Sequence, residues 1–299
     1  MERRQLGQTD MQVSVLGFGG AEIGFEGAAE ETVARILNSA LDAGLNVIDT
    51  AECYENSEEL IGKTISQRRD QLYLFTKCGH PRGLGSEDWS TTSLLESIQR
   101  SLHRLQTDHL DLILLHSCSE AVLSQGEAIA ALQTAKDKGY SRYIGYSGDS
   151  VAAKFAVECG AFDVLQTSVN IADQESIELT LPIAREKKMG VIAKRPIANA
   201  AWKEAHKPIE SYHHVYWERL RKLNYDFIGQ RPLEQSIAQA LRFTLSVPGV
   251  HTAIVGTAKP ERWSQNTKMV NAGALSETEF DSVRERWDEI HSRTWIGQT

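Results

Sequence analysis

Residues 110–147 read LDLILLHSCSEAVLSQGEAIAALQTAKDKGYSRYIGYS, and the order of the patterns in this segment indicates the fold class. It begins with the near-continuous apolar run LDLILLH (110–116) and ends with a second run, YIGYS (143–147). Between them, EAIAALQTAKDKG (127–139) has helical periodicity and closes on a glycine, as a helix C-terminus does. Strand, helix and strand in this order predict a parallel sheet with helices on its outer face.

The same alternation extends over most of the chain. Further apolar runs are VSVLGFG (13–19), NVID (46–49), LYLFTK (72–77), DVLQTSVN (163–170), GVIAK (190–194) and TAIVG (252–256). Helical patterns such as ETVARILNSALDAG (31–44) and LEQSIAQALRFTLS (233–246) lie between them. Eight strand–helix units in about 250 residues predict a (β/α)8 TIM barrel. A doubly wound sheet is the alternative, but its GxGxxG turn is absent from LGFGGAEIG (16–24).

The chain is predicted to form one domain, residues 1–299, because no Pro-, Gly- or Ser-rich linker divides it. RRQLG (3–7) and MQVSV (11–15) predict an N-terminal β-hairpin that closes the barrel bottom. The non-periodic segment 195–231 predicts a long substrate loop, since long loops in compact domains are usually functional. Residues 276–291 predict an extra C-terminal helix.

Composition and charge exclude several classes of protein. With 41% hydrophobic and 24% charged residues the chain is globular, and a net charge of −8 argues against a broad nucleic-acid surface. The four cysteines form no CxxC pair, so reduced thiols are expected, with no disulfide framework and no metal site. The start, MERRQLGQTD, has no signal core, and no apolar run is long enough for a membrane span. We expect a cytoplasmic protein.

Polar residues end the predicted strands. Asp49, Lys77 and His116 end three successive strands, and Ser147, Gln166 and Lys194 lie at the ends of the next three. All strands of a parallel barrel point the same way, so these groups are expected at one mouth, where barrel active sites are built. Tyr54 follows Asp49 closely and is expected to lean over the same mouth.

An aspartate, a lysine, a tyrosine and a histidine in one apolar cup can polarise a carbonyl group and deliver a proton to its oxygen. An ammonium group stabilises a neighbouring phenolate, and a carboxylate holds the ammonium in place. These groups supply no electrons, so a reduction requires a bound hydride donor. Each residue also has a structural interpretation: Asp49 and Lys77 as a buried ion pair, and His116 as a core histidine.

The motifs DTAECY (49–54), LFTK (74–77) and LILLHS (112–117), in this order, resemble the aldo-keto reductase superfamily. The resemblance runs nearly end to end, from LGQTDMQVSVLGFGG to VGTAKPERWSQN. It implies that Tyr54 is the general acid, that Lys77 tunes it and that Asp49 pairs with Lys77. It further implies that His116 positions the carbonyl of a small-molecule substrate beside Trp89. The hydride donor of the family is NADPH, bound extended across the barrel mouth.

The resemblance also implies a set of cofactor contacts, with four departures from the family pattern. Gly148 replaces an asparagine, and Lys194 replaces a tyrosine that stacks on the nicotinamide. Gly256 replaces a lysine that binds the 2′-phosphate in one branch of the family, and Gln265 replaces a common glutamate at the adenine. Lys259 and Arg262 are the cations left to bind that phosphate. NADPH is the expected cofactor, with NADH as the alternative. The implied contacts are Gly20, Ala21, Asp49, Ser147, Gly148, Gln166, Lys194, Arg195, Pro196, Ile197, Ala198, Asn199, Gly256, Thr257, Lys259, Arg262, Gln265 and Asn266.

Two other functions remain open at this stage. One is an NADPH-binding regulatory or redox-sensing barrel with slow turnover, a role that some members of the superfamily have. The other is a lyase or aldolase in which Lys77 attacks a carbonyl as an amine to form a Schiff base. Substrate specificity is expected to lie in the loops near Trp89, in the 195–231 segment and in the short tail after His291, and oligomeric state has no signature in the sequence.

Overall fold

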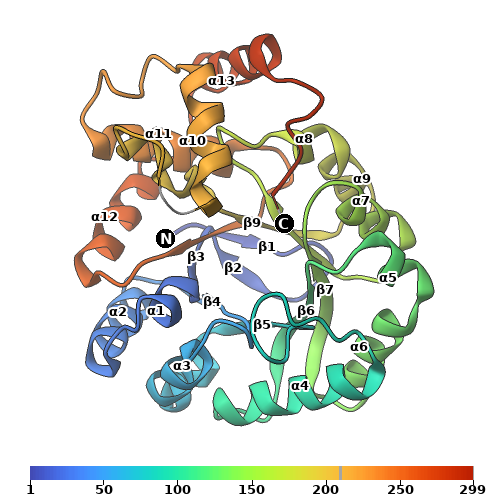
Figure 1. The fold of residues 1–299 in the computed structure, drawn as a ribbon. Helices are drawn as coiled ribbons and strands as arrows, with labels where there is room; N and C mark the ends of the chain where they lie inside the picture. The colour runs from blue at the N-terminus through green and yellow to red at the C-terminus, as the bar shows by residue number, and fades with distance from the viewer. Residues whose placement is uncertain (209–210, 299) are drawn as a thin grey trace.

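The computed structural model describes residues 1–208 and 211–298 and confirms the predicted barrel. Eight parallel strands close on themselves in the order β10-β3-β4-β5-β6-β7-β8-β9. Figure 1 shows these strands at the centre of a ring of helices. Their bounds are β3 (Leu16–Gly19), β4 (Val47–Asp49), β5 (Tyr73–Cys78), β6 (Leu110–His116), β7 (Ser141–Ser147), β8 (Val164–Ser168), β9 (Gly190–Lys194) and β10 (Thr252–Gly256).

The outer helices are amphipathic and cover the strands. In α4 (Thr91–Arg104), Leu94 and Ile98 lie one turn apart and are buried, and Ser90 caps the helix by accepting the Ser93 amide. The other outer elements are α2 (Glu30–Asp42), α3 (Ser57–Ile65), η1 (Ser66–Gln71), α5 (Glu120–Gln125), α6 (Glu127–Asp137), α7 (Ser150–Cys159), α8 (Glu175–Leu179), α9 (Leu181–Glu186), α11 (Leu233–Ser246) and α12 (Pro260–Asn271). Within the described part of the chain, no helix is both long and apolar enough to cross a membrane.

The predicted N-terminal hairpin closes the bottom of the barrel. Its strands are β1 (Arg3–Gln5) and β2 (Gln12–Ser14), so the run 13–19 divides between the hairpin and β3. Leu6, Met11 and Val13 pack against barrel residues such as Phe75 and Leu112, all fully buried. The apolar side chains of the hairpin thus fill the lower barrel interior.

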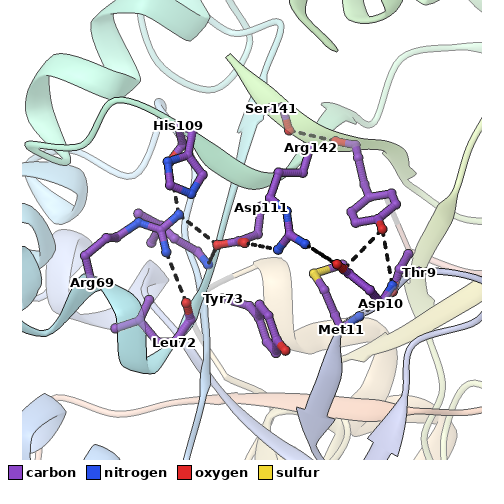
Figure 2. A network of polar contacts seen from close by, with 12 residues as sticks. Thr9, Asp10, Met11, Arg69, Leu72, Tyr73, His109, Asp111, Ser141 and Arg142 are labelled. Carbon is purple, nitrogen blue, oxygen red and sulfur yellow. Dashed lines mark hydrogen bonds and ion pairs between the residues drawn. The ribbon is translucent and has the colours of Figure 1, made fainter. Parts of the chain in front are cut away.

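An ionic network ties the hairpin to the barrel (Figure 2). Arg142 on β7 donates to Asp10 in the hairpin turn at 2.6 Å and to Asp111 on β6 at 2.7 Å. Asp111 also accepts from Arg69 at 2.8 Å. Asp111 and Arg142 lie near the starts of their strands. The network is therefore at the end of the barrel opposite to the one where barrel active sites are built.

The prediction of a long loop over 195–231 is wrong in part. The segment contains η2 (Ala198–Lys203) and a 13-residue helix, α10 (Ser211–Leu223); residues 209 and 210 lie outside the described residues. Tyr216, Leu220 and Leu223 are buried along one face of α10, at helical spacing, and the helix packs on η2. Aromatic and charged residues interleave in this helix and obscured its apolar face.

The extra C-terminal helix is confirmed as α13 (Glu277–Ile290). The helix begins with a capping box between Ser276 and Glu279, and its own residues Val283 and Trp287 are buried on the inner face. The chain then leaves α13 and runs to the centre of the ring, where Figure 1 marks the C-terminus. There the Gln298 carbonyl accepts a hydrogen bond from Arg195, the residue that follows β9, so the last described residues lie at the carboxyl ends of the barrel strands.

Candidate active site

The ends of the barrel strands bring the predicted site residues together. His116 pairs with Ser147 in the register of β6 and β7, and Ser147 pairs with Gln166 on β8. Asp49 pairs with Gly19 on β3, which in turn pairs with Gly256 on β10. Neighbouring strands place these residues at one level, so the side chains share one mouth.

A hydrogen-bonded chain runs beneath this mouth. Lys77 Nζ donates to Asp49 Oδ2 at 2.6 Å and to the Thr50 carbonyl at 2.7 Å. The second Asp49 oxygen accepts from Gln166 Nε2 at 2.8 Å, and Gln166 Oε1 accepts from Ser147 Oγ at 2.9 Å. Lys77, Asp49, Gln166 and Ser147 are all buried. These hydrogen bonds hold the Lys77 ammonium in one position. Removing Lys77 or Asp49 would leave the other charge buried without its counter-charge, which is strongly destabilising.

Tyr54 and His116 lie above the lysine. The Lys77 ammonium is 5.1 Å from the centre of the half-buried Tyr54 ring, and the His116 ring meets Tyr54 edge-on at 5.7 Å. Burial, with the charge of Lys77, holds the pKa of His116 well below its ordinary value. His116 is therefore a neutral imidazole that can donate a hydrogen bond but carries no charge.

Aromatic groups line the mouth on two sides. Phe25, at the end of α1 (Ala21–Phe25), meets Tyr54 edge-on at 5.5 Å and is 51% exposed. Trp89 reaches the site through His80, whose ring lies 5.6 Å from Trp89 and 5.2 Å from His116. Trp89 comes this close because Gly79 has no side chain: a β-carbon there would lie 2.0 Å from the indole. No motif in the sequence singled out Phe25 or His80 as site residues.

Two departures from the family pattern have structural reasons. A β-carbon on Gly148 would lie 2.3 Å from the Tyr146 hydroxyl, so an asparagine has no room there. Lys194 Nζ pairs with Asp149 Oδ2 at 2.9 Å, and both side chains are buried. Burial lowers the pKa of Lys194 to about 8, against the opposing attraction of Asp149. Burial also opposes ionisation of Asp149, but Lys194 and Arg195 outweigh it and hold the pKa of the carboxyl below its ordinary value.

The segment after β9 is strained. Ala198, Asn199 and Ala200 have φ of 45°, 53° and 48°, a left-handed turn that non-glycine residues adopt at a cost of roughly 1–2 kcal/mol each. Such strain clusters at ligand sites. Asn199 Nδ2 is buried and has no hydrogen-bond partner among the described residues. A buried donor without an acceptor fits a segment that binds a ligand oxygen.

A carboxylate lies at the end of β10, where the sequence predicted cofactor contacts. A β-carbon on Gly256 would come within 1.5 Å of Glu22 Oε2, so the Glu22 side chain fills that space. Burial raises the pKa of Glu22, and Glu26 adds to the shift. Glu22 forms no ion pair with any described residue, and no sequence motif indicated a carboxylate at this place.

The predicted phosphate ligands lie at the start of α12. Lys259 occupies the N-cap position of this helix, without a capping hydrogen bond from its side chain, and is exposed, whereas Arg262 is half-buried in the first turn; neither forms an ion pair with another described residue. Thr257 Oγ1 accepts the Lys259 amide at 3.0 Å. Asn266 is buried and Gln265 half-buried one turn further along the helix. Gly20 and Ala21 precede Glu22, which lies against Gly256 at the end of β10. The predicted contacts thus follow the ends of the neighbouring strands β7, β8, β9, β10 and β3 and continue to α12, and we call them the contact strip.

The C-terminal tail covers part of this strip. Arg195, which also donates to Ser168 Oγ at 2.9 Å, hydrogen-bonds the Gln298 carbonyl oxygen. The Gly297 amide donates to Glu175 at 2.6 Å, and Arg219 donates to the Ile296 carbonyl at 2.6 Å. No sequence motif indicated these contacts.

The chain belongs to the aldo/keto reductase family, whose model matches residues 15–288. The oxidoreductase YqkF of Bacillus subtilis (strain 168), itself described as uncharacterized, is 28% identical over 95% of this chain and 96% of its own. L-galactose dehydrogenase of Arabidopsis thaliana is 28% identical over 99% and 97% of the two chains. Among solved structures, the holo form of aldo-keto reductase AKR11C1 from Bacillus halodurans superposes with a TM-score of 0.83, at 28% identity and 96% coverage of both chains. The protein is therefore an oxidoreductase of this family.

Proposed function

We propose that this protein reduces aldehydes or ketones to alcohols with a nicotinamide cofactor, preferring NADPH to NADH. The observation that carries the proposal is the buried Lys77–Asp49 pair beneath Tyr54, with neutral His116 at the side of the same ring. A cation beneath a phenol favours proton release from the phenol, and a neutral imidazole can hydrogen-bond a carbonyl oxygen.

In this proposal the carbonyl oxygen lies between Tyr54 and His116. When bound, the nicotinamide supplies the hydride to the carbonyl carbon. His116 donates a hydrogen bond to the oxygen while negative charge develops there, and Tyr54 transfers its phenolic proton to that oxygen. Lys77 stabilises the phenolate left behind, and Asp49 with Thr50 keeps Lys77 in place. Phe25 and Trp89 line the approach of the substrate.

The strip of predicted contacts fits a dinucleotide. Ser147 offers a hydroxyl group and Gln166 an amide group to the nicotinamide carboxamide, and Lys194 lies two residues beyond the register partner of Gln166 on β9. Residues 195–199 follow as the proposed pyrophosphate segment, which the buried Asn199 Nδ2 without a hydrogen-bond partner among the described residues supports. Lys259 and Arg262 are the proposed ligands of the 2′-phosphate, with Gln265 and Asn266 at the adenine.

The test is Tyr54→Phe, assayed against a panel of aldehydes and ketones with NADPH and with NADH. Phenylalanine keeps the ring but has no proton to give, so turnover is expected to fall about 10²–10⁴-fold. Cofactor affinity, followed through quenching of tryptophan fluorescence, should stay unchanged. Tyr73→Phe is the matched control, because Tyr73 lies at the opposite end of the barrel beside the hairpin. A Tyr54→Phe variant that keeps more than about a tenth of its activity would rule out Tyr54 as the general acid.

A further inference from the structure

The thiol of Cys53 faces the ring of His116. Its Sγ lies 3.4 Å from His116 Nδ1, and both side chains are buried. The backbone of the histidine is held as well, because His80 Nε2 donates to the His116 carbonyl oxygen at 2.8 Å. Cys53 immediately precedes Tyr54 in the chain, so the turn that places the tyrosine also places the thiol.

The proton in this contact belongs on the sulfur. Burial raises the pKa of Cys53 to about 12, so the group is a thiol at neutral pH. Since His116 is neutral, its ring carries one N–H and one free lone pair. If the ring proton were on Nδ1, the thiol proton would have no acceptor, because Cys53 has no other hydrogen-bond partner among the described residues. A thiol that donates to the Nδ1 lone pair satisfies both groups.

We propose that Cys53 is a positioning residue that holds His116 in the tautomer with its proton on Nε2. The S–H donates to Nδ1, which excludes a proton from that nitrogen. Nε2–H is then the group available to a substrate carbonyl oxygen. The opposite tautomer would present a lone pair to the oxygen, and it would repel the negative charge that develops there.

The consequence for the reaction rests on the proposed role of His116 in carbonyl reduction. The tautomer of His116 is independent of that role, since it follows from the contact between Cys53 and His116 alone. The alternative is that Cys53 only fills space beside the ring. Valine is similar in size and shape to cysteine but has no donor, whereas serine keeps a donor in a smaller side chain.

The first measurement is the tautomer of His116 in the unaltered protein. Long-range ¹H–¹⁵N NMR separates a protonated from an unprotonated ring nitrogen, and His116→Asn identifies the signal among the nine histidines. We expect a protonated Nε2 and an unprotonated Nδ1. A protonated Nδ1 would overturn the proposal, whether or not the protein proves to reduce carbonyls.

The second measurement compares variants. Cys53→Val is expected to let the Nδ1–H tautomer appear and to lower kcat about three- to tenfold, the worth of one modest hydrogen bond, with cofactor KM unchanged. Cys53→Ser should restore both the tautomer and kcat. Cys78→Val is the matched control, because that buried thiol donates its hydrogen bond to the Leu114 carbonyl and not to the His116 ring. If Cys53→Val retains the single tautomer and full kcat, Cys53 only fills space.

Discussion

Gly297 packs directly on Asp149, so closely that a β-carbon on the glycine would lie 2.5 Å from the Asp149 β-carbon. Asp149 is the partner of Lys194, and Arg195 beside it bonds the carbonyl of Gln298. The tail thus rests on the residues proposed to adjoin the nicotinamide and the pyrophosphate. A cofactor that binds there has to displace the tail or bind beneath it.

Gly297→Val is therefore expected to force the tail off the mouth and to speed NADPH association. If the tail shields the cleft at a cost of about 1.4 kcal/mol, the rate should rise roughly tenfold. Stopped-flow quenching of tryptophan fluorescence measures it. Ile296→Val is the control, since that side chain is exposed and only its carbonyl is bound. An unchanged rate would mean that the tail does not gate the cleft, and a loss of NADPH binding would make the tail part of the site.

Lys77→Met should be nearly as damaging to turnover as the loss of the Tyr54 hydroxyl. Without the ammonium, the phenolate has no cation beneath it, and the buried Asp49 carboxylate loses its charged partner. Asp49→Asn should be milder, because Lys77 keeps its charge and its bond to the Thr50 carbonyl. The measurement is kcat for carbonyl reduction, with thermal melting to check that each variant folds. A Schiff-base lyase would instead depend on Lys77 and be indifferent to Tyr54→Phe, and borohydride with substrate would trap it.

Glu22→Gln and Arg262→Ala should shift cofactor preference in opposite directions. In the proposed site Arg262 forms a charge-assisted hydrogen bond to the 2′-phosphate, so its removal should weaken NADPH binding about ten- to hundredfold and leave NADH binding nearly unaffected. Glu22 places a carboxylate in the same region, against Gly256, so the isosteric Gln should strengthen NADPH relative to NADH. The ratio of the two KM values reports both effects.

The effect of Glu22 has a defined pH dependence. Burial raises its pKa, and the carboxyl is charged only above that value, so repulsion of the phosphate grows as pH rises through it. NADPH preference should therefore fall with rising pH in the unaltered protein and show no such step in Glu22→Gln. If Glu22→Gln and Arg262→Ala both leave the ratio unchanged, the 2′-phosphate lies elsewhere.

The local pattern of the sequence predicts the barrel and the polar side chains at the ends of its strands. The strands can be predicted because each is a short apolar run followed by a segment with helical periodicity. Since parallel strands all point one way, the residues that end them converge, and Asp49, Lys77 and His116 had to meet. Pattern failed over 211–223, where aromatic and charged residues interleave and only the burial of Tyr216, Leu220 and Leu223 identifies a helical face.

The contacts that refine the site were decided by tertiary structure alone. Cys53 and His116 are 63 positions apart, and nothing near either residue indicates that a thiol faces an imidazole. Glu22 reaches Gly256, and Gly297 reaches Asp149, only because the closed barrel brings its first and last strands together and the chain end returns across its mouth. Periodicity specifies which face of an element is buried. Which side chain contacts that face from a distant part of the sequence depends on how the elements pack, and no local sequence pattern specifies this packing.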